Sequence, residues 1–299
     1  MAAQIGTHSV HRVGYGAMQL DQQVSDDDAT AVLRRAVELG VNHIDTASFY
    51  GAGGVNRRIR QALAPYPDDL LIVSKVGASP ATGPIPLQPA QKPAQLRAEV
   101  EANLTQLGLE CIPVVNLRRL DVGPGLTAEG DQVVSLDDQL AEMIALRDEG
   151  KIGGIGLSAV DTDRVRAALG AGIVCVQNAY SVLDRAQEAT LDLCTAQGIA
   201  WVPFFPLGSA FAGFPSVTDH PEVQAIAAAL DATAAQVGLA WLLAHSPHTL
   251  LIPGTRSVQH LDENVAAGQL TLPDDALARL DRVGSSAGQP LGAGGFTPR

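Results

Sequence analysis

Three side chains that can together move a proton lie in two short segments of the sequence. Asp45 and Tyr50 belong to VNHIDTASFYG, residues 41–51, and Lys75 belongs to LLIVSKVG, residues 70–77. A lysine ammonium close to a tyrosine hydroxyl favours the phenolate and lowers the tyrosine pKa, which would make Tyr50 a usable acid at neutral pH. A buried lysine needs a partner, and Asp45 is the nearest carboxylate that the sequence offers. The pattern predicts a general-acid site, although an Asp–Lys pair could also be purely structural and Asp45 alone could cap a turn.

A fourth candidate stands at the end of VVNLRRLD, residues 114–121. This segment begins as a buried strand and closes on two arginines. Because side chains alternate along a strand, residues 114, 116 and 118 share the inward side. We therefore expect Arg118 at the edge of the site, and Arg119 at the surface or anchoring a loop.

The elements that would position these residues repeat in a fixed order. A helical pattern, a glycine and a short apolar run recur along the chain, which is typical of alternating helices and buried parallel strands. Ser25 and Ser135 are the predicted caps of two of the helices, the first of which should end near Leu39. The predicted strands lie near 14–18, 41–45, 70–76, 111–118, 152–157, 173–178, 199–204 and 249–252.

Eight strands alternating with helices predict an α/β fold with a single (β/α)8 TIM barrel over residues 1–299, and residues 285–299 as a flexible tail. The main rival, a doubly wound sheet, lacks its G-x-G-x-x-G turn between a strand and a helix. The proline-rich stretch 78–93 is expected to be a loop after the third strand. This stretch, the 119–134 loop and the C-terminal tail should shape the substrate pocket.

Composition excludes several classes of protein. The 299 residues carry a net charge of -12, which is unsuited to phosphate-backbone binding and argues against nucleic acid as a partner. No apolar run is long enough for a membrane span and the N-terminus has no signal pattern, so we expect a cytoplasmic protein without a membrane partner. Cys111, Cys175 and Cys194 should be buried, reduced thiols, and no histidine pattern indicates a metal site.

The motifs as a set resemble the aldo-keto reductase family. GYGAMQL, GVNHIDTASFYG, VVNLR, GIGLS, VCVQNAY, VPFFPLG and LAWLLAHSPHTLLIPGTRSVQHLDEN follow that family's order over nearly the whole chain, and are most similar to its bacterial pyridoxal reductase branch. The resemblance implies a monomeric or weakly associated barrel that uses NADPH to reduce an aldehyde or ketone, with pyridoxal as one candidate. It implies that Tyr50 protonates the carbonyl oxygen, Lys75 lowers the Tyr50 pKa and Asp45 holds Lys75.

Arg118 stands where most members of that family carry a catalytic histidine. An arginine stays charged, so Arg118 could polarise a carbonyl or hold an anionic or phenolate oxygen of the substrate, but it could not act as a base. We therefore count Arg118 among the catalytic candidates. Pyridoxal, a 3-hydroxypyridine aldehyde, would offer such an oxygen.

The same resemblance implies the residues that bind the cofactor. They are Ser158 and Gln177 for the nicotinamide carboxamide, Phe204 for stacking on its ring, Leu207, Gly208 and Ser209 near the pyrophosphate, and Gly254, Thr255, Arg256, Gln259, Glu263 and Asn264 for the adenosine. Arg256 would meet the 2′-phosphate of NADPH. Gly254 and His260 replace cations that many members carry, so NADH is an alternative cofactor.

Two other functions fit parts of the pattern. Lys75 could form a Schiff base in an aldolase, which would have no need of the cofactor residues. Alternatively, relatives of this fold bind the cofactor as regulatory subunits with little turnover, a role that predicts an exposed partner surface.

Overall fold

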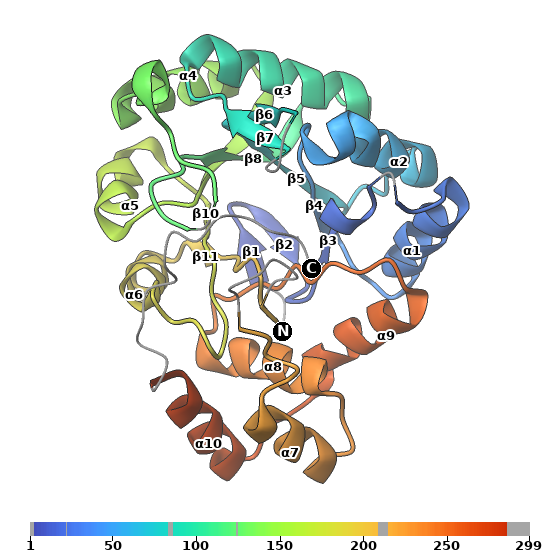
Figure 1. Ribbon diagram of the computed structural model, residues 1–299. Helices are drawn as coiled ribbons and strands as arrows, with labels where there is room; N and C mark the ends of the chain where they lie inside the picture. The colour runs from blue at the N-terminus through green and yellow to red at the C-terminus, as the bar shows by residue number, and fades with distance from the viewer. Residues whose placement is uncertain (1–2, 22, 83–85, 124, 209–214, 286–299) are drawn as a thin grey trace.

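A curled parallel sheet forms the centre of the molecule, and helices surround it (Figure 1). The computed structural model describes residues 3–21, 23–82, 86–123, 125–208 and 215–285. The strands, in their order across the sheet, are β3 (Tyr15–Gly16), β4 (His43–Asp45), β5 (Leu71–Val76), β8 (Ile112–Arg118), β9 (Ile152–Ser158), β10 (Cys175–Gln177) and β11 (Ala200–Trp201). Neighbouring strands in the sheet follow one another in the sequence and are parallel, as alternating βα units require.

The predicted eighth strand is not formed as a regular strand. In the described part of the chain, residues 249–252 contribute two isolated parallel bridges, from Thr249 to Trp201 and from Leu251 to Val13. Backbone hydrogen bonds join this segment to both sides, from Leu250 to the Trp201 carbonyl and from Leu251 to the Arg12 carbonyl. The prediction of eight strands was therefore too regular. Prolines at 203, 206 and 253 lack a donor N–H and limit how far the ladder can extend on this side.

The helices lie outside the sheet and match the predicted alternation. They are α1 (Asp26–Glu38), α2 (Gly54–Leu63), α3 (Pro93–Leu107), α4 (Leu136–Asp148), α5 (Thr162–Ala168), α6 (Glu188–Gln197), α7 (Pro221–Ala229), α8 (Ala234–His245), α9 (Val258–Ala266) and α10 (Asp274–Ser285). Short 3₁₀ turns are η1 (Ala17–Gln19), η2 (Tyr50–Gly53), η3 (Gly130–Gln132), η4 (Leu169–Ala171) and η5 (Ala267–Gln269). The caps predicted for α1 and α4 are confirmed, because the hydroxyls of Ser25 and Ser135 accept from the backbone three residues on.

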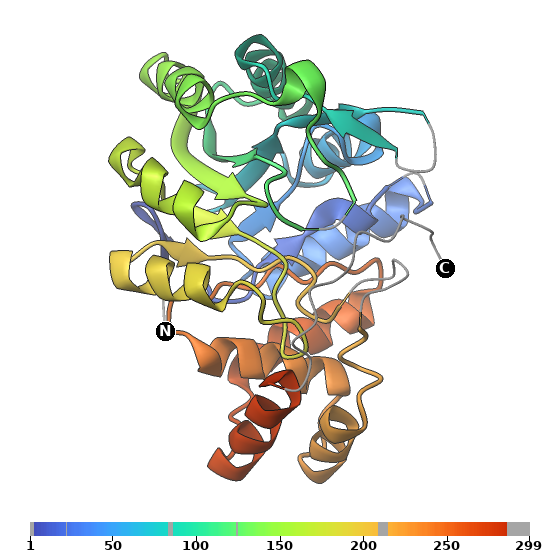
Figure 2. The same cartoon turned by 60° about the vertical axis from the view of Figure 1, so that its left-hand side comes forward.

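Two antiparallel hairpins lie at opposite ends of the sheet (Figure 2). One pairs β1 (Ala3–Ile5) with β2 (His8–Val10), close to where the parallel strands begin. The other pairs β6 (Ala78–Pro80) with β7 (Leu87–Pro89) and follows the end of β5. The proline-rich stretch after the third strand is thus partly a hairpin and not only a loop, which a two-stranded edge pairing tolerates.

The core has an inner and an outer part, as the strand alternation predicted. Inside the curled sheet, Leu71, Val73 and Val114 pack with residues of β10 and β11 and with Ile5 and Val10 of the first hairpin. Between the sheet and the helices, Val115 and Leu117 belong to a separate cluster with apolar side chains of α3, α4 and α8. Asp45, Lys75 and Arg118 have the parity of the inner set, so the strands direct them to the interior.

One sequence expectation about buried residues needs correction. Cys175 and Cys194 are buried free thiols, but Cys111 is exposed because it precedes β8 on the outside of the molecule. His43 is buried inside the sheet, and neither ring nitrogen has a hydrogen-bond partner in the described structure. Burial lowers the pKa of His43 to about 4, so the ring is neutral at physiological pH.

The interior is tightly packed at Gly156. A Cβ at this position would lie 1.9 Å from Asn116 Oδ1 and 2.6 Å from Cys175 Sγ, and both of these side chains are buried. By contrast, a Cβ at Gly170 in η4 would meet nothing within 4 Å. These two glycines form a matched pair for testing the packing.

We expect Gly156→Ala to lower the free energy of unfolding by about 1–3 kcal/mol, because buried neighbours must shift to admit the methyl group. Gly170→Ala should change it by less than about 0.5 kcal/mol. Urea unfolding of the two variants and the unchanged protein measures the difference. Equal stability of the two variants would contradict the packing at Asn116 and Cys175.

Candidate active site

An ion pair between two neighbouring strands lies at the centre of the candidate site. Lys75 Nζ, near the end of β5, donates to Asp45 Oδ1 at the end of β4, and it also donates to the Thr46 carbonyl at 3.2 Å. Asp45 and Lys75 are each only 4% exposed. Tyr50 begins η2 after β4, and the Lys75 ammonium lies 5.0 Å from the centroid of its ring. The structure therefore brings together the three residues that the sequence singled out.

Electrostatics keep Lys75 protonated. Burial by itself would lower the Lys75 pKa, but the charge of Asp45 and the contacts with Asp45 and Tyr50 outweigh burial and raise it. A Schiff-base lysine needs a neutral amine and usually a lowered pKa. The environment of Lys75 is the opposite, so it suits a fixed positive charge near Tyr50 and not an aldolase nucleophile.

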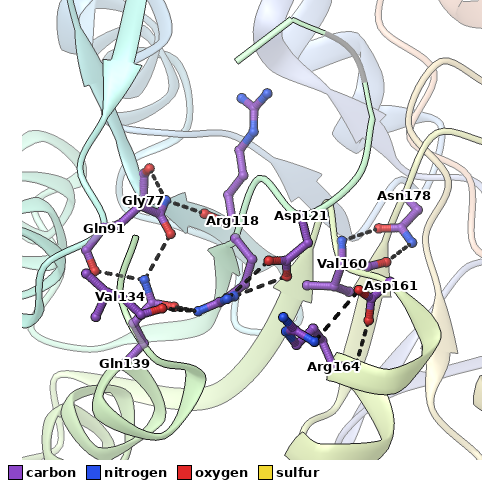
Figure 3. Close-up of polar contacts among 11 residues, drawn as sticks. Gly77, Gln91, Arg118, Asp121, Val134, Gln139, Val160, Asp161, Arg164 and Asn178 are labelled. Atoms are coloured by element: carbon purple, nitrogen blue, oxygen red, sulfur yellow. Dashed lines mark hydrogen bonds and ion pairs between the residues drawn. The ribbon is translucent and has the colours of Figure 1, made fainter. Parts of the chain in front are cut away.

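A second positive charge, Arg118, faces the same region from the end of β8. Its guanidinium has no ion pair or side-chain hydrogen bond among the described residues, and Figure 3 shows the side chain extending away from the polar network around it. Burial lowers the pKa of Arg118, and the Tyr50 hydroxyl group opposes that effect. An arginine nevertheless remains charged, so this cation is available to a ligand.

These residues form the floor of a cavity of about 640 Å³ at the ends of the strands. Asp45, Tyr50, Lys75, Arg118 and Ser158 supply polar groups there, and Gln19, Asp21 and Gln23 are further polar residues of the lining. Its walls are largely apolar and come from η1, from the segment after β4, from both predicted loops and from the loop after β11: Met18, Phe49, Pro80, Leu87, Leu120, Val122, Leu126, Phe204 and Phe205. A mostly apolar pocket with a few convergent polar groups is typical of a small-molecule site.

Unusual backbone conformations gather around this cavity. Among the described residues other than glycine, five have a positive φ, and four of them, Ala52, Leu120, Ala159 and Phe205, line the cavity. Such conformations cost about 1–3 kcal/mol each and persist only where the surroundings impose them. The loops are therefore held in defined conformations. Leu120 lies in the predicted 119–134 loop and Phe205 in the VPFFPLG motif, but neither was predicted individually as a lining residue.

Of the residues predicted to contact nicotinamide, Ser158 and Phe204 line the cavity, and Gln177 lies inside the sheet. Gln177 Nε2 donates to Asp45 Oδ2 at 2.8 Å across the interior. Its Oε1 atom is buried without a partner. Gln177 thus holds the second carboxylate oxygen of Asp45, and its own Oε1 atom stays free to accept among the described residues. The sequence did not reveal this contact between Gln177 and Asp45.

The described residues predicted for the rest of the cofactor lie outside the lining of this cavity. Gly208 has a φ of 86°, and a Cβ there would lie 2.1 Å from the Pro215 carbonyl oxygen. Only glycine therefore fits at this position. Leu207 packs partly buried beside it, whereas Ser209 is outside the described residues.

The predicted adenosine segment lies before and within α9. Gly254 comes close to Gln19 of the cavity wall, Thr255 is buried, and Gln259 donates to Glu263 at 3.0 Å. Asn264 is buried, and Arg256 is exposed without an ion pair in the described part of the chain. The structure therefore collects these side chains around one helix.

Arg119, the neighbour of Arg118, is not a surface residue. It is 8% exposed, forms two hydrogen bonds to Asp121 at 3.1 Å, and donates to the Val134 carbonyl and to Gln139. Of the two expectations, the loop anchor is confirmed and the surface position is wrong.

Within the described ranges, no cluster of three histidine, cysteine or acidic residues could hold a metal.

Comparison with known proteins decides the family. The model of the aldo/keto reductase family matches residues 12–285. The chain belongs to the aldo/keto reductase family. A pyridoxine 4-dehydrogenase from Escherichia coli (strain K12) is 46% identical over 290 residues, which cover 93% of this chain and 96% of that protein. An NADH-specific methylglyoxal reductase from the same organism is 28% identical, over 85% of this chain and 86% of that protein.

Solved structures agree with this assignment. An aldo-keto reductase from Klebsiella pneumoniae in complex with NADPH superposes with a TM-score of 0.78 at 26% identity, covering 94% of each chain. This aldo/keto reductase is therefore an oxidoreductase with a fold of the TIM-barrel type. No single helix in the described structure is long and apolar enough to cross a membrane. Among the described residues, only α7 and α8 taken together reach that length and composition, and they are bent by 94° at their junction.

A buried carboxyl lies directly behind the site. Glu99 of α3 accepts from the Gly77 backbone N–H at 2.8 Å through Oε2, and its Oε1 atom is buried without a partner among the residues that the structure describes. Burial raises the pKa of Glu99 to about 8, and the hydrogen bonds from Gly77 and Ala78 only partly oppose this. Since the ordinary glutamate pKa is far lower, the folded protein holds a proton there that the unfolded chain releases.

The raised Glu99 pKa predicts a pH-dependent stability. Its contribution is fully present below the unfolded pKa and is lost as the pH rises to about 8. The stability of Glu99→Gln relative to the unchanged protein should therefore rise between pH 5 and pH 8.5, by on the order of 3 kcal/mol. Urea unfolding at several pH values measures this gain. The exposed Glu101→Gln on the same helix is the control, and a pH-independent difference for Glu99→Gln would contradict the buried proton.

Proposed function

We propose that this aldo/keto reductase reduces an aldehyde with NADPH, and that pyridoxal is its substrate. The observation that carries the proposal is the Asp45, Lys75 and Tyr50 group on the floor of a largely apolar cavity. The 46% identical relative, a pyridoxine 4-dehydrogenase, supports pyridoxal. The Arg118 guanidinium, which has no side-chain partner in the described part of the chain, suits an aldehyde that carries an acidic hydroxyl, as pyridoxal does.

The residues present fit NADPH. The unpartnered Gln177 Oε1 and the Ser158 hydroxyl would hold the nicotinamide carboxamide, and Phe204 would contact the ring. Arg256, which is exposed and has no ion pair among the described residues, lies just before α9 and would meet the 2′-phosphate. The remaining positions are those that the resemblance implies: Leu207, Gly208, Ser209, Gly254, Thr255, Gln259, Glu263 and Asn264. NADH stays an alternative, and an NADH-specific relative supports it.

The reaction needs a proton at the carbonyl oxygen as well as a hydride at the carbonyl carbon. When bound, NADPH supplies the hydride. Tyr50 donates its hydroxyl proton to the oxygen, and the adjacent Lys75 ammonium stabilises the phenolate that is left. Asp45 fixes the ammonium by the ion pair, and Gln177 fixes Asp45 through its second oxygen. Arg118 polarises the carbonyl or holds the neighbouring oxygen of the substrate.

The remaining parts of the proposal concern the protein as a whole. We infer a single domain in which residues 249–252 take the eighth position of a (β/α)8 barrel, supported by their bridges to both sides of the sheet. We infer a monomer or weak homo-oligomer in the cytoplasm, where the free cysteines would stay reduced.

The first test removes the general acid. Tyr50→Phe should lower kcat with pyridoxal by about 10²–10⁴-fold, because the carbonyl oxygen loses its proton donor. Loss of absorbance at 340 nm measures the rate, and fluorescence titration with NADPH should show unchanged binding. Tyr66→Phe, which changes a tyrosine bonded to the Leu107 carbonyl on the outer side, is the control and should keep full activity. Equal rates for Tyr50→Phe and the unchanged protein would refute the assignment.

The second test addresses the cofactor. Arg256→Ala should raise the KM for NADPH by about 10-fold or more, since a charge-assisted hydrogen bond to phosphate is lost. The KM for NADH should change little. Steady-state kinetics with both cofactors, and with Arg166→Ala as an exposed control on α5, measure the effect. A similar rise for both cofactors would show that Arg256 does not bind the 2′-phosphate.

A further inference from the structure

The pairing of β5 with β8 ends one step before Arg118. The last paired residues are Val76 and Leu117, and the next two carbonyl groups, of Gly77 and Arg118, lie close enough to accept from the same side-chain nitrogen. A Cβ at Gly77 would lie 2.3 Å from the Arg118 carbonyl oxygen, and its φ of 107° also requires glycine. Two carbonyl oxygens that face each other need a donor between them.

Gln91 supplies that donor. Its side-chain amide donates to the Gly77 carbonyl at 2.5 Å and to the Arg118 carbonyl at 2.8 Å (Figure 3). Gln91 follows the β6–β7 hairpin, and the backbone N–H of the neighbouring Ala90 also donates to the Gly77 carbonyl. The base of the hairpin is thereby joined to the end of the strand that carries Arg118.

Gln91 is itself held in one orientation. It is 1% exposed, and Gln139 of α4 donates to both its backbone carbonyl and its Oε1 atom, at 2.8 and 2.9 Å. Arg119 in turn donates to Gln139 Oε1 at 2.5 Å and forms an ion pair with Asp121. Arg119 and Asp121 are the two sequence neighbours of Leu120. A buried network in which the members fix one another is rigid and tolerates few alternatives.

This network connects three parts of the cavity wall. The hairpin contributes Pro80 and Leu87, the loop after β8 contributes Leu120, and Arg118 contributes the charge. Because the Arg118 guanidinium has no side-chain partner in the described residues, its position depends on how its backbone is held. A shift of about 1 Å at such a group can cost about 10²-fold in rate.

We propose that Gln91 is a positioning residue that, through the Arg118 backbone, directs the guanidinium toward an acidic oxygen next to the aldehyde of the substrate. Gln139 and Arg119 orient Gln91 in this role. The inference rests on the proposed carbonyl reduction and narrows its substrates to aldehydes that carry a hydroxyl of phenol type beside the carbonyl group.

The test compares two aldehydes that differ only in that hydroxyl, 2-hydroxybenzaldehyde and benzaldehyde, and includes pyridoxal. Gln91→Leu keeps the size of the side chain but removes both donors. We expect kcat/KM to fall about 10- to 100-fold for 2-hydroxybenzaldehyde and pyridoxal, and less than about threefold for benzaldehyde. NADPH binding should be unchanged. Gln224→Leu, which removes a bond to the Thr218 carbonyl on the outer side, is the matched control.

A double-mutant cycle with Arg118→Met separates positioning from general structure. If Gln91 acts through Arg118, adding Gln91→Leu to Arg118→Met should cause little further loss with 2-hydroxybenzaldehyde. Gln139→Met leaves Gln91 in place but removes the bonds that orient it. It should lower kcat/KM for the same substrates as Gln91→Leu does, but by a smaller factor. It keeps the test decisive if Gln91→Leu does not fold.

The outcomes are distinct. Equal losses for both benzaldehydes, or an undiminished loss in the Arg118→Met background, would overturn the positioning role while leaving the carbonyl reductase intact. Unchanged kinetics in both Gln91→Leu and Gln139→Met would overturn it as well. If the unchanged protein reduced none of the aldehydes with either cofactor, the proposed function and this inference would both fail.

Discussion

The buried ion pair between Asp45 and Lys75 is the interaction on which the site depends. Removing two charges from water is costly, and their attraction offsets that cost only when further hydrogen bonds satisfy the remaining atoms. Here Gln177 and the Thr46 carbonyl supply those bonds from different parts of the sheet. The pair joins β4 to β5, and Gln177 extends the connection across the interior to β10. The positive charge beside Tyr50 is thus fixed by three strands.

A second theme is how the strand ends are held once regular pairing stops. Beyond Val76 and Leu117 the ladder between β5 and β8 gives way to side chains that bind backbone groups, with Glu99 on the Gly77 N–H and Gln91 on the Gly77 and Arg118 carbonyls. Such buried side chains do the work of missing ladder bonds while letting the loops diverge around a cavity. The same region holds the positive-φ residue Leu120. Rigid anchoring and an open cavity therefore coexist at the same edge.

Much of the arrangement could be predicted from local patterns. Parity along β4, β5 and β8 placed Asp45, Lys75 and Arg118 on the inner side, since strand alternation is a local property. Caps at Ser25 and Ser135 were predicted for the same reason. The predicted eighth strand is present only as two isolated bridges, because an apolar run does not reveal whether its neighbours offer a regular ladder. Arg119 and Cys111 were partly misjudged, because burial depends on which element covers a residue.

By itself, the sequence determined the αβ alternation, the inward parity of the strands and the motifs that link the chain to the aldo/keto reductases. These depend on side-chain periodicity and on residues close together in the chain. Only the tertiary structure decided that Gln177 reaches Asp45 and that Gln91 bridges Gly77 and Arg118. Such contacts join residues 14 to 132 positions apart. Each needs a buried polar atom to meet its one available partner, and that is settled only when the whole chain has packed.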